Sequence, residues 1–288
     1  MRPDFVPDHI HERAIRPLLV AGAHGTLGRA FGRICHTRGL AAVALGRADF
    51  DIANPASVAA ALHKHRPWAV VNAAGYVRVD DAETDVERCF RENATGPAVL
   101  AAACAERALP LLTFSSDLVF DGEQEGPYAE SATPRPLNVY GRSKLAGEQL
   151  VLAAHPAALV VRTSAFFSGW DEHNFVHFAL EAARHGHPFE AAEDVRIAPT
   201  YVPDLVNAAL DLLLDEARGI WHLACQDSCT WAELARVAAR RAGLSDEFVV
   251  PRRMVDLGLP AARPRQSVLT SEKGMLQPSI ADALGRML

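Results

Sequence analysis

The chain has 288 residues, of which 49% are apolar and 22% are charged. It carries 35 acidic and 29 basic residues, a formal net charge of −6, and so lacks the basic surplus of nucleic-acid-binding proteins. This composition also excludes a disordered chain, and no apolar run approaches the roughly 20 residues that a membrane helix needs. We expect a globular protein that binds neither nucleic acid nor a membrane.

The first sixteen residues mix charged side chains, prolines and histidines and contain no apolar stretch. They form no secretory signal, and the acidic residues Asp4, Asp8 and Glu12 argue against a transit peptide. We interpret residues 1–16 as a tail or linker, although a lid over a binding site would also fit this composition.

Short apolar runs alternate with segments of helical periodicity over the first 168 residues. The first run, Leu18–Ala21, ends at a glycine and is typical of a buried strand feeding a turn. Helical spacing follows from Thr26 to Arg38, where Gly39 ends the helix. The pattern further predicts strands at 40–45, 68–72, 109–115 and 157–163 and helices at 55–65, 86–107 and 140–154. This alternation predicts the α/β class, with a doubly wound, Rossmann-type parallel sheet covered by helices on both faces.

Beyond residue 168 the pattern is less regular. It predicts helices at 174–184, 202–214, 231–242 and 279–288, a strand at 220–224 and a loop at 251–265. We predict a dinucleotide-binding domain at 17–168 and a smaller, interleaved C-terminal substrate lobe at 169–288. A segment near 200–224 should return from that lobe to the sheet.

Three glycines, Gly22, Gly25 and Gly28, occupy the turn between the first strand and its helix. Glycine lets the backbone turn tightly and approach a pyrophosphate, whose charge meets the helix N-terminus. A glycine-rich turn alone is weak evidence, but its place in a strand–helix–strand unit indicates a dinucleotide site. We expect this site to include Thr26 and Leu27, which follow within the turn.

The end of the second strand predicts which dinucleotide is bound. An acid there would bond the ribose 2′-hydroxyl of NAD, whereas an arginine accommodates the 2′-phosphate of NADP. No acid ends this strand, and Arg47 follows it. We therefore predict NADPH as the cofactor, with NADH possible because Arg47 could also be a solvated surface charge. At Asp51 and Ile52, a carboxylate could meet the adenine edge.

Small and hydroxyl-bearing residues end the next two strands. Ala73, Ala74 and Gly75 leave room for a ligand at the C-terminal edge of the sheet, although a tight turn would use the same residues. The fourth strand ends in Ser115-Ser116-Asp117, which places hydroxyl groups at the same edge. We expect both segments to border the bound cofactor or substrate.

Tyr140 and Lys144 are four residues apart in a predicted helix and so share one face. A free tyrosine has a pKa of about 10, too high for easy proton exchange at neutral pH. A neighbouring ammonium would stabilise the phenolate and lower that pKa, giving a tunable proton donor. A Tyr-x-x-x-Lys pair alone is mostly structural, but here it follows a dinucleotide turn and a Ser-Ser strand end.

Five cysteines are spread along a chain that is not short, and an odd number does not suit a disulfide framework. We therefore expect a reducing, cytoplasmic environment. His222, Cys225 and Cys229 lie close in sequence, but no second close pair completes a tetrahedral ligand set. We predict no metal site.

Taken in order, these motifs resemble those of the extended short-chain dehydrogenases and, more narrowly, of the dTDP-4-dehydrorhamnose reductase group of sugar-nucleotide reductases. The glycine turn and the Tyr-x-x-x-Lys pair are shared by all short-chain dehydrogenases. The resemblance covers nearly the whole chain from about Leu18 onward. Its other segments include Val79-Asp80, Asn93-Ala-Thr-Gly96, Val119-Phe-Asp-Gly122, Arg162-Thr-Ser164 and Arg263-Pro264.

The resemblance implies a role for each matching residue. Tyr140 would be the general acid that protonates the C4 oxygen of a sugar and would also contact the cofactor. Lys144 would bind the nicotinamide ribose and lower the tyrosine pKa. Ser116 would hold the substrate carbonyl, and Asn93 would belong to the cofactor site. Val79 and Asp117 would border the sugar. Arg263 or Arg265 would contact the phosphates of the substrate, unless these arginines lie in a surface loop.

Two positions depart from the pattern of this group. Leu118 stands where the group commonly has a tyrosine, and Ala165 stands where it commonly has a tryptophan. The missing aromatic groups would line the sugar, so dTDP-4-dehydrorhamnose itself is in doubt as the substrate.

The favoured function is the NADP(H)-dependent reduction of the 4-keto group of a nucleotide-activated deoxysugar. An alternative is a binding or regulatory subunit that keeps the dinucleotide fold without turnover. A third possibility is reduction of a ketone that carries no nucleotide, which would make Arg263 and Arg265 irrelevant. A homodimer is possible.

Overall fold

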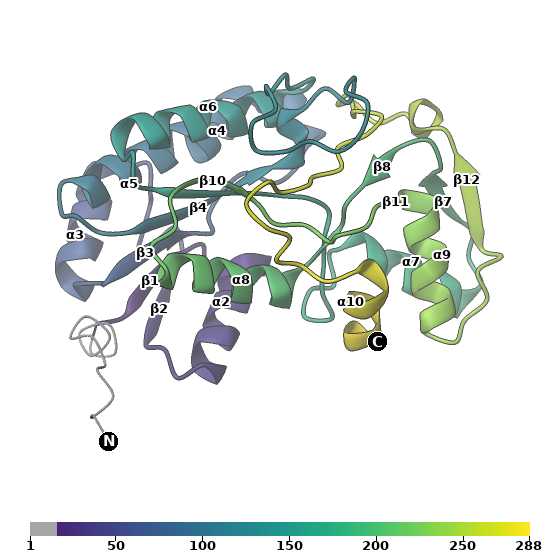
Figure 1. Ribbon diagram of the computed structural model, residues 1–288, viewed down its shortest axis with the longest axis horizontal. Coiled ribbons are helices and arrows are strands. Elements are labelled where there is room, and N and C mark those ends of the chain that lie inside the picture. Colours follow the sequence, from purple (N-terminus) through teal and green to yellow (C-terminus); the bar gives the residue numbers. More distant parts are fainter. Residues whose placement is uncertain (1–15) are drawn as a thin grey trace.

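The structure is a computed structural model that describes residues 16–288 (Figure 1). The predicted tail therefore lies, except for its last residue, outside the described residues. Within the described part, no helix combines the length and the apolar character needed to cross a membrane.

A six-stranded parallel sheet forms the centre of the molecule, in the order β10-β5-β4-β3-β1-β2. Its strands are β1 (Leu18–Ala21), β2 (Ala42–Leu45), β3 (Ala69–Asn72), β4 (Leu111–Ser116), β5 (Leu159–Thr163) and β10 (Gly219–His222). The chain runs outward from β1 to β2 and then reverses through β3, so the topological switch point lies between β1 and β3. Ligands of open parallel sheets bind in the crevice outside the C-terminal strand ends at such a point.

Helices cover both faces of the sheet, which confirms the predicted doubly wound α/β class (Figure 1). Leu18 and Val20 of β1 pack into one core cluster, whereas Leu19 and Ala21 pack into another. A strand buried on both faces explains why its sequence is continuously apolar. The first cluster holds α2 (Thr26–Thr37) and α8 (Val202–Leu214), and the second holds α3 (Pro55–His65), α5 (Gly96–Ala105) and α6 (Val139–Ala154).

The single helix expected over 86–107 is divided. A π-helical turn at Arg91–Thr95 separates α4 (Val86–Phe90) from α5. Within this turn, the Asn93 side chain accepts a hydrogen bond from Tyr76 N at 2.9 Å and donates one to Tyr76 O at 3.0 Å. A Cβ at Gly147 would lie 2.1 Å from Asn93 O, so only glycine lets α6 pack this closely on the turn. Such π-turns often occur at functional sites.

A second lobe packs beyond the C-terminal edge of the sheet, around α7 (Phe175–His185) and α9 (Trp231–Arg241) (Figure 1). The predicted loop at 251–265 is partly wrong, because its first residues belong to β12, where Pro251 pairs with Ala191. An edge strand tolerates a proline, which has no N–H group to donate. The elements of this lobe are β6 (Phe166–Phe167), α7 (Phe175–His185), β7 (Phe189–Ala192), β8 (Arg196–Ile197), β9 (Thr200–Tyr201), β11 (Cys229–Thr230), α9 (Trp231–Arg241), β12 (Val249–Arg252) and α10 (Ile280–Met287).

A buried ion pair fixes α6 against the sheet. Arg162 of β5 donates to both carboxylate oxygens of Glu148 in α6, at 2.7 and 2.6 Å. The two side chains are 2% and 3% exposed. His222 of β10 lies 3.3 Å from the same guanidinium, so the pair joins one helix and two strands.

Candidate active site

Two adjoining cavities lie at the C-terminal edge of the sheet. The larger, of about 700 Å³, is lined by the glycine turn, and we name it the cofactor cavity. The smaller, of about 460 Å³, is lined by Ser116 and Tyr140, and we name it the substrate cavity. They form a connected space because both are lined by Val77, Ala165, Phe166, Phe175 and Trp231.

The glycine turn has the geometry that a pyrophosphate needs. Gly22 has a φ of +92°, and a Cβ at Gly28 would lie 2.0 Å from Gly22 O, so neither position tolerates a side chain. Gly25 caps α2 with no side-chain hydrogen bond, and the first turn of that helix contains no acidic residue. The cofactor cavity is lined by Gly22, Gly25, Thr26 and Leu27, and Gly28 packs behind the turn. These residues fit a dinucleotide, whose phosphates would meet the free N–H groups of α2.

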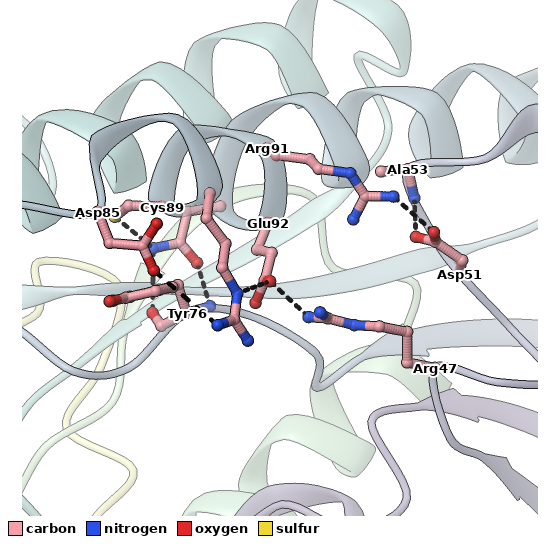
Figure 2. Close-up of polar contacts among 10 residues, drawn as sticks. Arg47, Asp51, Ala53, Tyr76, Asp85, Cys89, Arg91 and Glu92 are labelled. Atoms are coloured by element: carbon pink, nitrogen blue, oxygen red, sulfur yellow. Dashed lines mark hydrogen bonds and ion pairs between the residues drawn. The ribbon is translucent and has the colours of Figure 1, made fainter. Parts of the chain in front are cut away.

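The other end of the cofactor cavity carries Arg47, Asp51 and the largely buried Ile52. Arg47 is bound to Glu92, and Asp51 accepts hydrogen bonds from Arg91 Nη2 at 2.5 Å and from the backbone of Ala53 at 3.0 Å (Figure 2). Partial burial alone would raise the pKa of Asp51, but these bonds outweigh it and lower the pKa. Two arginines and two carboxylates therefore surround this end.

The segment after β3 lies beside Lys144 of α6, which is itself not among the described residues that line either cavity. Ala73, Ala74 and Gly75 line the cofactor cavity, and a Cβ at Gly75 would lie 3.3 Å from Lys144 Nζ. Asn93 is not among the described residues that line either cavity; its amide instead holds the π-turn, including a bond to Ser143 Oγ at 3.0 Å.

Local packing brings Tyr140 next to Ser116. Asn138 caps α6 by accepting a hydrogen bond from Gly141 N at 2.7 Å. A Cβ at Gly141 would lie 2.1 Å from Leu118 O, so this glycine lets the first turn of α6 approach the end of β4. Tyr140 and Ser116 thus line one wall of the substrate cavity.

The pKa of Tyr140 differs from the sequence expectation. Burial raises it above its ordinary value, the charge of Asp117 adds to this effect, and a hydrogen bond with Ser116 offsets only part of it. The ammonium of Lys144, which donates to Phe114 O at 3.3 Å and lies 5.7 Å from the tyrosine ring centroid, does not bring the pKa below its ordinary value. Tyr140 therefore keeps its proton at neutral pH, as a general acid must.

Burial lowers the pKa of Lys144 to about 8, and the charges of Cys89 and Glu148 offset only part of the effect. The ammonium form, which can make charge-assisted hydrogen bonds, is therefore lost as the pH rises through 8. We expect the dissociation constant of the cofactor to rise several-fold, about 3- to 10-fold, across this range. Titrations at fixed ionic strength check this. Lys144→Met should show the weaker binding throughout, and a parent protein with constant affinity from pH 7 to 9 would refute the prediction.

The four predicted substrate residues differ in position. Val79 and Asp117 line the substrate cavity, and Asp117 accepts hydrogen bonds from Ser116, Ser164 and Ser267. Burial raises the Asp117 pKa although these bonds oppose it. Arg263 lines the cavity too, but it binds both carboxylate oxygens of Asp80, at 2.9 and 2.7 Å. Arg265 is exposed and is not among the described residues that line a cavity.

The two residues that depart from the family pattern line the substrate cavity, together with two aromatic residues from the second lobe. Leu118 and Ala165 line the substrate cavity, and Ala165 has a φ of +35°. Phe175 and Trp231, whose ring centroids are 4.7 Å apart, line both cavities. Sequence reasoning missed this pair because no local motif marks it, and only folding of the lobe brings it to the site.

Comparison with known proteins agrees with this geometry. Residues 16–281 match the family model described as the RmlD substrate binding domain. A dTDP-4-keto-6-deoxy-D-glucose reductase from Streptomyces niveus is 34% identical, over 87% of this chain and 87% of the relative. A dTDP-4-dehydrorhamnose reductase from Mycobacterium tuberculosis is 37% identical, over 90% of this chain and 86% of the relative.

A solved structure extends the likeness to three dimensions. The dTDP-4-dehydrorhamnose reductase from Bacillus anthracis, crystallised in complex with NADP, superposes with a TM-score of 0.90 at 29% identity. The match covers 94% of this chain and 98% of that one. The fold is therefore that of the Rossmann-type reductases. The chain belongs to the family of the RmlD substrate binding domain.

Proposed function

We propose that this protein is an NADPH-dependent reductase of the 4-keto group of a nucleotide-activated deoxysugar. The observation that carries the proposal is the continuity of the two cavities, with the glycine turn in one and Ser116 and Tyr140 in the other. The names of the relatives support this substrate class, and the NADP of the solved relative supports the cofactor.

The chain's own residues would position the reactants and supply the proton. The N-terminus of α2 would hold the pyrophosphate, and Lys144 would bond the ribose next to Gly75. Bound NADPH supplies the hydride. Ser116 would donate a hydrogen bond to the sugar carbonyl, and Tyr140 would give its proton to the C4 oxygen as negative charge develops there. Because Tyr140 is buried beside Asp117, it holds that proton until the oxygen becomes basic.

The proposal extends to organisation and place of action. Residues 17–168 would bind the dinucleotide, and 169–288 would mainly bind the sugar, with β10 returning to the sheet. All five cysteines are free and buried, which supports action in a reducing cytoplasm. A homodimer is one possible assembly, and gel filtration with light scattering would determine the oligomeric state.

An NADPH-oxidation screen against nucleotide-linked 4-ketosugars and free ketones tests the function. Turnover of a nucleotide-linked sugar alone supports the proposal, and turnover of free ketones with equal efficiency favours the rival reductase. Quenching of NADPH fluorescence with no oxidation by any ketosugar would favour a binding subunit instead.

Cofactor choice gives a further prediction. Arg47 lies in the cofactor cavity, so we expect NADPH to bind more tightly than NADH, by about 1–3 kcal/mol for a charge-assisted contact. Calorimetric titration should show this difference shrinking in Arg47→Ala. Equal affinities in the parent protein that stay equal in Arg47→Ala would mean that Arg47 does not meet the 2′-phosphate.

Substrate breadth follows from Leu118 and Ala165. Neither offers the ring or hydroxyl that would select a sugar, so we expect a roomy pocket that accepts bulkier deoxysugars or works poorly on dTDP-4-dehydrorhamnose. The measurement is kcat/KM for that sugar in the parent and in the double variant Leu118→Tyr, Ala165→Trp. We expect the double variant to improve by about tenfold, the value of one good polar contact. Efficient turnover by the parent, unimproved in the variant, would show that the missing aromatic groups do not decide the substrate, as expected if another aromatic such as Phe166, Phe167 or Trp170 fills the space.

A further inference from the structure

Two arginines at the Arg47 end of the cofactor cavity are each held by a carboxylate, as Figure 2 shows. Arg47 Nη2 lies 2.6 Å from Glu92 Oε1, and Arg91 Nη2 lies 2.5 Å from Asp51 Oδ2. All four residues line the cavity. The guanidinium groups that would meet a phosphate here are therefore already partly neutralised.

Glu92 is held more deeply than Asp51. Its side chain is 7% exposed, and the oxygen that binds Arg47 also accepts a hydrogen bond from Arg88 Nε at 2.8 Å. Burial alone would raise the pKa of Glu92, but the bonds from Arg88 and Arg47 outweigh it and lower the pKa. The π-turn thus presents a fixed negative charge beside Arg47, whose own side chain is 56% exposed.

We propose that Glu92 sets how strongly the site prefers NADPH over NADH, by competing with the 2′-phosphate for Arg47. This inference rests on the proposed function, in which the cavity holds that cofactor. A 2′-phosphate bound to Arg47 would lie close to the carboxylate of Glu92. The two negative charges would repel each other, and the low dielectric constant around the buried carboxylate would strengthen this repulsion. NADH carries a neutral hydroxyl at that position and meets no such repulsion. Glu92 therefore reduces the preference for NADPH over NADH that Arg47 provides.

Competition and orientation predict opposite results for Glu92→Gln. If the carboxylate competes, the substitution should tighten NADPH binding and leave NADH binding unchanged. The ratio of their dissociation constants should then rise about tenfold in favour of NADPH, measured by fluorescence titration. If Glu92 instead serves Arg47 by orienting it, NADPH binding weakens. An unchanged or smaller ratio in Glu92→Gln overturns the inference.

A second variant keeps the test open should Glu92→Gln fold poorly. Arg88 is half exposed and is not among the described residues that line a cavity. Arg88→Gln removes one of the two arginines that bind Glu92, so the carboxylate would bind Arg47 more strongly. The preference for NADPH should then fall several-fold, about 3- to 10-fold, and an unchanged preference contradicts the inference.

The matched control is Asp85→Asn. Asp85 is another carboxylate beside Arg88, with Oδ2 3.9 Å from Arg88 Nη1, and it is not among the described residues that line the cavities. We expect an unchanged ratio, and a rise as large as that in Glu92→Gln would show a general charge effect and overturn the inference. A parent protein that binds neither nucleotide would refute the proposed function itself. Binding of both with a ratio insensitive to Glu92 would refute the inference alone.

Discussion

Replacement of Tyr140 by phenylalanine is expected to lower kcat by about 10² or more, because the ring remains and the proton donor is lost. Tyr140 lies on the wall of the substrate cavity beside Ser116, and its raised pKa keeps it protonated at neutral pH. The cofactor cavity does not include it, so NADPH should bind with its parental affinity. Steady-state kinetics and a cofactor titration on the same preparation measure both effects.

The control for this variant is Tyr201→Phe, which likewise removes a tyrosine hydroxyl; Tyr201 is buried and is not among the described residues that line either cavity. It should keep kcat within about twofold of the parent, as expected for a residue remote from the chemistry. Parental activity in Tyr140→Phe would remove this tyrosine from the mechanism.

Loss of the Glu148–Arg162 ion pair is expected to have the largest effect on stability. Glu148→Ala would leave the Arg162 guanidinium buried without its carboxylate, at a cost of about 3–5 kcal/mol in the free energy of unfolding. Urea denaturation followed by tryptophan fluorescence measures this difference. The pair joins α6, which carries Tyr140, to β5, so the variant should also lose activity at lower urea concentrations.

The matched control removes the carboxylate of an exposed pair. Asp211 binds Arg38 at 2.6 Å, and its side chain is 60% exposed. Asp211→Ala should cost about 0–1 kcal/mol, since water screens such pairs. If Glu148→Ala lowers the free energy of unfolding no more than Asp211→Ala does, then burial does not make the Glu148–Arg162 pair more important for stability than an exposed pair.

Local features made much of the site predictable from the sequence. The glycine turn and the Ser116 strand end each follow one strand, and Tyr140 and Lys144 lie within one helix, so each motif is local in sequence. Parallel strands bring their C-terminal ends to one edge, so these motifs meet once the alternation of strands and helices is recognised.

Other features depend on contacts between distant segments. Arg263 binds Asp80 across 183 residues of sequence, and no local pattern indicates that partner. Glu92 binds Arg47 from the π-turn that interrupts the predicted helix, and no local pattern predicts that turn. The pKa of Tyr140 depends on its depth of burial and on Asp117, which residue spacing does not reveal. The positions of helices and strands could therefore be predicted largely from the sequence, whereas side-chain partners and burial required the structure.

The most direct test of the central claim follows the hydride itself. The protein would be supplied with NADPH carrying deuterium at the transferable position of nicotinamide C4, together with a dTDP-linked 4-keto-6-deoxysugar. Mass spectrometry and NMR of the product should find one deuterium, bound to C4 of the sugar. Oxidation of the cofactor without deuterium at that carbon, or no reaction with any nucleotide-linked ketosugar, would contradict the account.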